Sequence, residues 1–240
     1  MKRPVLFFHH AISGHYTLTK ARGTCKLLSQ LAELISLSQD FKMLPINIHT
    51  YVHDTVQETN DKQLEYLFFS VFTPELSEIT GREVTVTFHR NVPGITDFSY
   101  AHYSDCYSNL CAFEEAISAD LQTAFAACKA NSPRPAKLTD IDLLLIDDYL
   151  VKSLKVEGIA LPEANIACAT TFGRVVVAHE VGHCLGATHE DAALYRDTEF
   201  NDPNHCATFM ATQRPEWTCA LFGYSAENRY NIHNYLKDAP

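Results

Sequence analysis

The sequence predicts a single α+β domain in which helices pack against a mixed β-sheet. The 240 residues are 46% hydrophobic and 20% charged, a composition typical of a globular chain that is long enough to bury a core. Apolar residues recur at the spacing of a strand in some segments and at that of a helix in others. The predicted order of these elements is strand, helix, strand, strand, helix, strand. Because neither repeats nor Gly/Ser linkers interrupt this order, we expect one domain over 1–240.

Four segments have the pattern of β-strands. The segment 83–89, EVTVTFH, alternates β-branched and aromatic residues with polar ones, which predicts a half-buried strand. The segment 142–147, DLLLID, is a short apolar run between polar ends and predicts a buried strand. Strands are also predicted at 4–9 and 46–56.

Four further segments are predicted to be helical. Apolar residues at intervals of three or four predict amphipathic helices at 26–41 and 109–128. The segment 173–186 is apolar on almost all sides, so this helix is expected in the interior. A last helix is predicted to begin near Ser225, a typical N-cap residue, and to end at about Leu236.

Charge and hydropathy exclude two classes of partner. The 19 Lys and Arg against 29 Asp and Glu give a net charge of −10, which repels phosphate backbones and argues against nucleic acid. No stretch reaches the roughly 18 apolar residues of a membrane span, so we expect a soluble protein. The first apolar run is interrupted by His9 and His10, which favours a strand over a signal peptide.

The predicted interior helix carries a metal-binding pattern, HExxHxxGxxH. His179 and His183 are four residues apart, so a helix places both imidazoles on one face where they can converge on one ion. Gly186 is expected to end the helix in the left-handed conformation and to turn the chain so that His189 approaches from the other side. Three imidazoles leave a fourth position for water, as in catalytic zinc sites. Glu180, beside the first ligand, is the predicted general base.

Two other interpretations of this pattern stay open. The histidines could be satisfied core residues, although five fixed residues at this spacing arise by chance in roughly one such sequence in ten thousand. The site could also hold zinc without catalysis, in an effector or toxin module that acts by protein binding. The presence of Glu180 argues against a silent site, since a chain freed from catalysis has no reason to keep the base.

The pattern resembles the signature of the metzincin zinc endopeptidases, whose other mark is a methionine in a tight turn beneath the zinc ligands. The segment 206–211, CATFMA, is similar to this Met-turn and contributes Met210. The segments 140–145 and 158–168 are similar to the strands that precede the zinc helix in the reprolysin branch, the ADAM and snake-venom type. The segment 58–108 looks like an insertion without a counterpart.

The resemblance implies the metzincin fold, with a twisted mixed sheet, an active-site helix and a cleft between subdomains 1–188 and 189–240. It implies an endopeptidase that holds one zinc ion through His179, His183 and His189, with Met210 as an apolar floor beneath them. Gly158, Ile159 and Ala160 would belong to an edge strand that binds an extended peptide, and 211–217 would wall the pocket after the cut. We therefore expect a secreted, monomeric enzyme that acts on proteins or peptides.

The sequence departs from the related patterns at three places. Glu190 follows His189 where reprolysins usually have Asp, and Thr212 stands where astacins place a tyrosine ligand. Three residues separate Cys206 from Met210, whereas reprolysins have Cys, Ile and Met in succession.

The remaining candidate groups have structural interpretations. By the resemblance, Cys168, Cys206 and Cys219 match disulfide-bonded positions, so at least two bridges are expected, and Cys106 and Cys111 are close enough to close a small loop. Cys184 is rotated about 100° from His183 on the helix, which favours a disulfide or a buried thiol over a ligand.

Neither a second metal site nor calcium has support in the sequence. His49 and His53 would lie about 13 Å apart on one face of a strand, too far to share an ion. His205, near the Met-turn, is expected to be a solvated loop residue. The acidic stretch 197–202 predicts a solvated loop rather than a calcium site.

Overall fold

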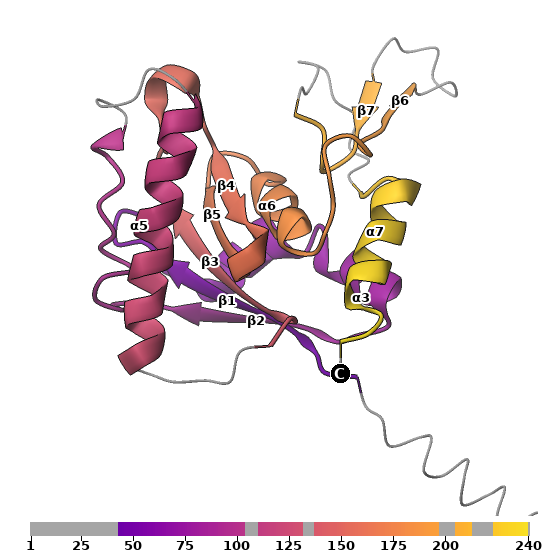
Figure 1. Ribbon diagram of the computed structural model, residues 1–240, viewed down its shortest axis with the longest axis horizontal. Coiled ribbons are helices and arrows are strands. Elements are labelled where there is room, and N and C mark those ends of the chain that lie inside the picture. The colour runs from indigo at the N-terminus through magenta and orange to yellow at the C-terminus, as the bar shows by residue number, and fades with distance from the viewer. Residues whose placement is uncertain (1–42, 104–109, 132–136, 197–204, 213–222, 240) are drawn as a thin grey trace, which may run out of the picture. The chain divides into compact units, whose positions relative to one another are not determined.

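The computed structural model describes residues 43–103, 110–131, 137–196, 205–212 and 223–239 (Figure 1). These residues belong to one compact unit, Met43–Pro240. The strand predicted at 4–9, the helix predicted at 26–41 and the acidic stretch 197–202 lie outside the described residues.

A five-stranded mixed sheet forms the centre of the described unit, as predicted. Four strands run parallel, and the fifth, β4, pairs antiparallel with β5 at one edge. In the order β2-β1-β3-β5-β4, the strands are Val84–His89, Ile46–Val52, Asp140–Ile146, Ile166–Thr170 and Gly158–Leu161. The predicted strand 46–56 therefore ends four residues early, because the chain turns at Asp54 and Thr55. The two-stranded antiparallel sheet of β6 (Leu194–Arg196) and β7 (His205–Ala207) was not predicted.

Helices cover both faces of the sheet (Figure 1). The predicted helices at 109–128, 173–186 and 225–236 are confirmed as α5 (Leu110–Asn131), α6 (Val176–Cys184) and α7 (Ala226–Leu236). The residues before α6, 173–175, lie in irregular chain and a turn, so this helix begins later than predicted. Ser225 is the N-cap of α7, and its side chain accepts a hydrogen bond from the Asn228 N–H. No helix among the described residues is long and apolar enough to cross a bilayer.

Alternation along the strands divides the core into two layers. Leu144 and Ile146 of β3 pack with α5 on one face, whereas Leu143 and Leu145 face the opposite side with α6. Successive side chains of a strand point to opposite faces, so a strand covered on both faces reads as a continuous apolar run. The short sequence IACAT of β5 (Ile166–Thr170) is buried at all five positions for this reason.

The described part of the segment 58–108, residues 58–103, belongs to this core. It forms α2 (Asp61–Leu64), the π-helical turn η1 (Glu65–Phe69), α3 (Thr73–Thr80) and strand β2. Phe69, Phe72 and Leu76 are fully buried in the layer that contains α6. The buried guanidinium of Arg82 donates to the carbonyls of Leu236 and Ala239, which ties this segment to the end of α7.

Candidate metal centre

Helix α6 presents two of the predicted metal ligands on one face. His179 and His183 lie one turn apart, and their rings meet edge to face with centroids 4.8 Å apart. The rest of the helix is held by burial, since Val177, Ala178 and Val181 are fully inaccessible in the core. The two imidazoles therefore project from a helix that is anchored along its other sides.

The chain reverses direction after α6 at the predicted glycine. Gly186 has φ +86°, the left-handed conformation that a residue with a Cβ adopts only with strain. The Ala187 N–H donates to the Gly182 carbonyl at 2.9 Å, and the Gly186 N–H donates to the His183 carbonyl at 3.1 Å. These bonds satisfy the last carbonyls of the helix, and the turn brings His189 back over it.

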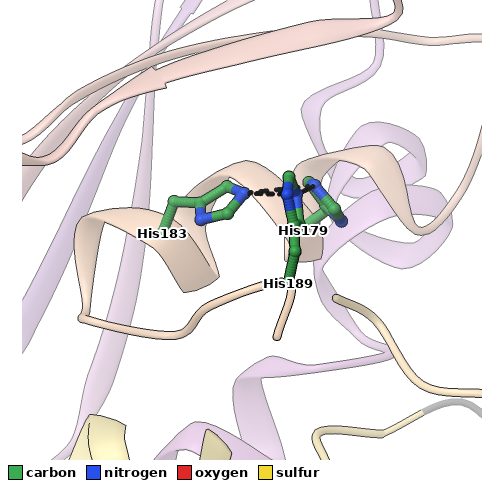
Figure 2. A group of neighbouring side chains, drawn as sticks. All are labelled: His179, His183 and His189. Atoms are coloured by element: carbon green, nitrogen blue, oxygen red, sulfur yellow. Dashed lines mark hydrogen bonds between the residues drawn. The ribbon is translucent and has the colours of Figure 1, made fainter. Parts of the chain in front are cut away.

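The Nε2 atoms of the three histidines converge on one point (Figure 2). Their separations are 3.2 Å between His179 and His183, 2.9 Å between His183 and His189, and 2.9 Å between His189 and His179. Donor atoms bound at about 2.0–2.1 Å to a tetrahedral zinc ion lie roughly 3.3 Å apart, close to these values. The three rings thus have the spacing of ligands to a single ion.

Hydrogen bonds to backbone carbonyls fix the tautomers of two rings. His179 Nδ1 lies 2.7 Å from the Phe209 carbonyl oxygen, and His183 Nδ1 lies 3.0 Å from the Ala187 carbonyl oxygen. A carbonyl can only accept, so each Nδ1 carries the proton and donates it. In the neutral ring the Nε2 atom then bears a lone pair, which is the form that binds a metal. Burial, followed by the nearby His189, lowers the pKa of His183 and favours this neutral form.

The donor set fits zinc. The Nε2 lone pairs of His179 and His183 cannot hydrogen-bond to each other, so a cation between the rings, or a proton donated by His189 Nε2, would satisfy them. Imidazole nitrogens are ordinary zinc ligands, and three of them leave a coordination position open for water. Within the described ranges, His179, His183 and His189 form the group of potential metal-binding side chains, with ligand atoms that all lie within 4.8 Å of one another.

The Glu180 carboxylate lies at the start of the edge strand β4. Glu180 is buried, with 6% of its surface exposed, and it follows His179 directly on α6. A Cβ added at Gly158 would lie 2.4 Å from Glu180 Oε1, so the carboxylate packs directly against the Gly158 backbone. The predicted general base and the predicted peptide-binding strand are therefore neighbours in the structure.

Met210 lies beneath α6. Its side chain is fully buried, and a Cβ added at Gly182 would lie 2.8 Å from the Met210 sulfur. The preceding residue, Phe209, supplies the carbonyl that accepts from His179. The predicted Met-turn segment thus contacts the helix through a side chain and the His179 ring through a backbone oxygen.

An open cavity of about 640 Å³ contains the candidate site. His179, Glu180 and His189 lie on its wall, with Gly158 of β4 and with Ala211 and Thr212 after the Met-turn. The other residues that line it are Glu114, Leu154, Lys155, Val156, Glu157 and Val176. Residues 213–217 of the predicted pocket wall lie outside the described residues. Of the predicted β4 residues, Ile159 and Ala160 are half-buried and follow Gly158 along the strand.

The cysteines correct two expectations. Cys168 and Cys111 are free, so the expected bridge at Cys168 and the small loop closed by Cys111 are wrong. Cys184 is a buried thiol that contacts the Ile166 carbonyl at 3.4 Å, which is one of the two alternatives predicted for it. Cys206 is disulfide-bonded. The remaining expectations fall on cysteines outside the described residues.

The other histidines named from the sequence lie away from the metal centre. His49 Nδ1 lies 3.3 Å from His89 Nε2 on the neighbouring strand. His53 follows β1 rather than lying in it, and its ring contacts Thr55 Oγ1 at 2.9 Å and the Phe98 carbonyl at 3.0 Å. The side chain of His205 lies outside the described residues.

Sequence reasoning missed the residues that support the third ligand. The Asn228 side chain on α7 bonds both backbone groups of Thr188, the residue before His189. No sequence pattern links these positions, which are forty residues apart. The sequence also could not show that the carbonyls of Phe209 and Ala187 accept from the histidine rings, because every residue carries a carbonyl.

Comparisons with known proteins find distant structural similarity. No family model matches the sequence, and no curated protein matches it. The chain is distantly similar to a solved zinc-dependent peptidase from Methanocorpusculum labreanum, strain Z, at 16% identity and a TM-score of 0.38. The match covers 77% of this chain and 99% of that chain.

Proposed function

We propose that this chain is a zinc-dependent endopeptidase of the metzincin type, with sequence motifs nearest to the reprolysin branch. The observation that carries the proposal is the convergence of three histidine Nε2 atoms, with backbone carbonyls setting the tautomers of His179 and His183. His179 and His189 lie on a cavity wall together with a buried carboxylate and an edge strand. A metal centre, a base and a surface for an extended chain are the parts that peptide hydrolysis needs.

The histidines would hold the ion, and Glu180 would move the proton. A zinc ion bound here would lower the pKa of water toward about 7 and polarise the scissile carbonyl. Glu180 would take the proton of the attacking water and deliver it to the departing amine. Its burial against Gly158 holds the carboxylate in one position beside the ligand helix. Because the carboxylate is already in position, little free energy is lost to its reorientation when the proton moves.

Strand β4 would bind the substrate backbone. It ends the described sheet and pairs on one side with β5, so its other edge can pair with an extended peptide. Gly158 begins this strand at the Glu180 carboxylate, which would place a bound peptide across the candidate centre. Main-chain pairing of this kind suits cleavage within a chain rather than at its end. The candidate ligands, the base and the edge strand all belong to one chain, so the proposed chemistry needs no second subunit.

The test is cleavage of a diverse peptide mixture by zinc-loaded protein, with new termini identified by mass spectrometry. Glu180→Ala should reduce cleavage by at least about 100-fold while zinc content and circular dichroism stay unchanged. Glu65→Ala, which removes an exposed carboxylate from η1, is the matched control and should cleave normally. A chelator should stop cleavage by the wild type, and added zinc should restore it.

Two results would contradict the proposal. Folded, zinc-loaded wild type that cleaves nothing in the mixture would favour the second candidate, a zinc-binding effector or toxin module. Cleavage that survives Glu180→Ala would show that Glu180 is not the general base.

A secreted location belongs to the same proposal and is supported by the disulfide bond at Cys206, since disulfides persist in oxidising compartments. Recovery of the native protein only from a reducing compartment, with Cys206 open to alkylation, would contradict it.

A further inference from the structure

The third candidate ligand is held differently from the first two. His179 and His183 lie on α6, where helical hydrogen bonds fix the backbone. His189 lies on exposed chain after the turn at Gly186, and its side chain is exposed. Its Nε2 is nevertheless 2.9 Å from both of the other Nε2 atoms. Some contact outside α6 must therefore define the path of the chain through this residue.

Asn228 of α7 makes that contact. Its side chain is fully buried, Oδ1 accepts from the Thr188 N–H at 2.7 Å, and Nδ2 donates to the Thr188 carbonyl at 3.0 Å. One amide group thus binds both backbone groups of the residue that precedes His189. Because these two groups belong to successive peptide planes, the pair fixes the direction in which the chain enters His189.

A second set of bonds holds the chain after His189. Ser225 Oγ, at the start of α7, donates to the Asp191 carbonyl. Asn231 Nδ2 donates to the Asp191 carboxylate at 2.7 Å, and Thr188 Oγ1 donates to the same carboxylate at 3.2 Å. The first two turns of α7 therefore hold both ends of the segment 188–191.

Helix α7 is itself tied to the rest of the unit. Arg229 donates to the Glu75 carboxylate of α3 at 2.7 Å, and Arg82 donates to the Leu236 carbonyl at 3.0 Å. The Tyr235 side chain packs on Gly186, at the turn that leads to the third histidine. The 188–191 segment is thus attached to the core through α7.

We propose that Asn228 is a positioning residue of the metal centre, which acts through the Thr188 backbone to hold His189 in place before an ion binds. This inference depends on the proposed metal site. A ligand held in advance loses less conformational freedom when it coordinates, so removal of the clamp lowers metal affinity. Asn228 itself touches neither the ion nor the substrate.

The test is the zinc affinity of folded protein, measured by competition with a chromophoric chelator. Asn228→Ala should bind Zn²⁺ about 10- to 100-fold more weakly than the wild type. Cobalt absorption at saturation should also change, because a displaced His189 alters the ligand geometry around Co²⁺. A structural role for the helix alone would change neither the affinity nor the spectrum of the folded fraction.

Ile232→Val is the matched control on the same helix. Ile232 is fully buried, and the substitution weakens the packing of α7 without touching Thr188 or Asp191. Its zinc affinity should stay within about twofold of the wild type. If Asn228→Ala does not fold, Asn228→Asp tests the same bonds at the same size, because its second oxygen faces the Thr188 carbonyl and cannot donate to it. This variant should also bind zinc more weakly.

The outcomes separate the two proposals. Wild type that binds no zinc contradicts the proposed function. Wild type that binds zinc, with Asn228→Ala or Asn228→Asp equal to it, overturns the role of Asn228 alone. Equal losses in Ile232→Val and the Asn228 variants would also overturn it, since helix stability would then explain the effect.

Discussion

Backbone carbonyls decide the chemistry of the candidate centre at the scale of single residues. Phe209 and Ala187 accept from the Nδ1 atoms of His179 and His183 and so leave both Nε2 lone pairs facing the same point. The turn that contains Met210 thus supports the centre in two ways, through the sulfur against Gly182 and through the carbonyl of the residue before it. A methionine at this turn gives an apolar contact, whereas the oxygen sets a tautomer.

A substitution at Gly158 tests the position of the Glu180 carboxylate. Gly158→Ala would place a Cβ 2.4 Å from Glu180 Oε1, so the carboxylate must move. Peptide cleavage should fall by about tenfold or more in kcat/KM, while zinc affinity stays unchanged because no histidine is displaced. Gly223→Ala is the control, since its Cβ would meet its nearest neighbour, the Glu75 carboxylate, at an ordinary 3.4 Å. Equal activity of Gly158→Ala and wild type would show that Glu180 is placed otherwise.

At the scale of elements, two acidic side chains of α3 bind helix α7 and the chain that leads into it. The Glu75 carboxylate of α3 accepts from the Tyr224 N–H at 3.1 Å and from Arg229 at 2.7 Å, while Glu78 accepts from the other arm of that guanidinium at 2.7 Å. The side chain of Glu75 is 17% exposed and that of Glu78 is 72% exposed. One acid is therefore a partly buried anchor of α7, and the other is a surface partner.

The two acids make a matched pair of variants. Glu75→Ala should lower the free energy of unfolding by about 1–3 kcal/mol, because it leaves the Tyr224 N–H and Arg229 without a half-buried acceptor. Glu78→Ala should cost less than about 0.5 kcal/mol, as is usual for an exposed ion pair. Urea unfolding of each variant measures the difference. Similar losses in both would mean that the anchor at Glu75 adds little.

At the scale of the whole molecule, both layers of the core contain buried side chains that can ionise. Cys168 faces α5 and Cys184 faces the opposite layer, and burial raises the pKa of both thiols above 9.0, with the Glu180 charge as a further cause. Burial also raises the pKa of Tyr224. These groups stay protonated in the folded protein at pH values where they ionise in the unfolded chain.

The folded protein should therefore lose stability in alkali. Above about pH 9 the unfolded chain binds fewer protons than the folded one, so each buried thiol removes about 1.4 kcal/mol of unfolding free energy per pH unit. Urea unfolding between pH 8 and pH 10, without oxygen and with a chelator, measures this slope. The double variant Cys168→Ala and Cys184→Ala should show a shallower slope. A wild-type stability that is constant over this range would contradict the prediction.

The sequence by itself determined those features that depend on residues close together in the chain. The spacing of His179, His183 and Gly186 predicts a ligand helix and its left-handed end, because helical geometry repeats every 3.6 residues. Alternation at 84–89 and an apolar run at 142–146 predict two strands of the sheet for a similar local reason. The N-cap at Ser225 is likewise a local signal.

The tertiary structure alone decided which distant residues meet. No local pattern could show that Asn228 binds the backbone beside His189, that Phe209 sets the tautomer of His179, or that Gly158 receives the Glu180 carboxylate. It also brought 61–80 into the core and left Cys168 unbridged. Each of these contacts joins segments whose separation in space depends on the packing of the whole sheet, and a periodic pattern carries information only about one element at a time.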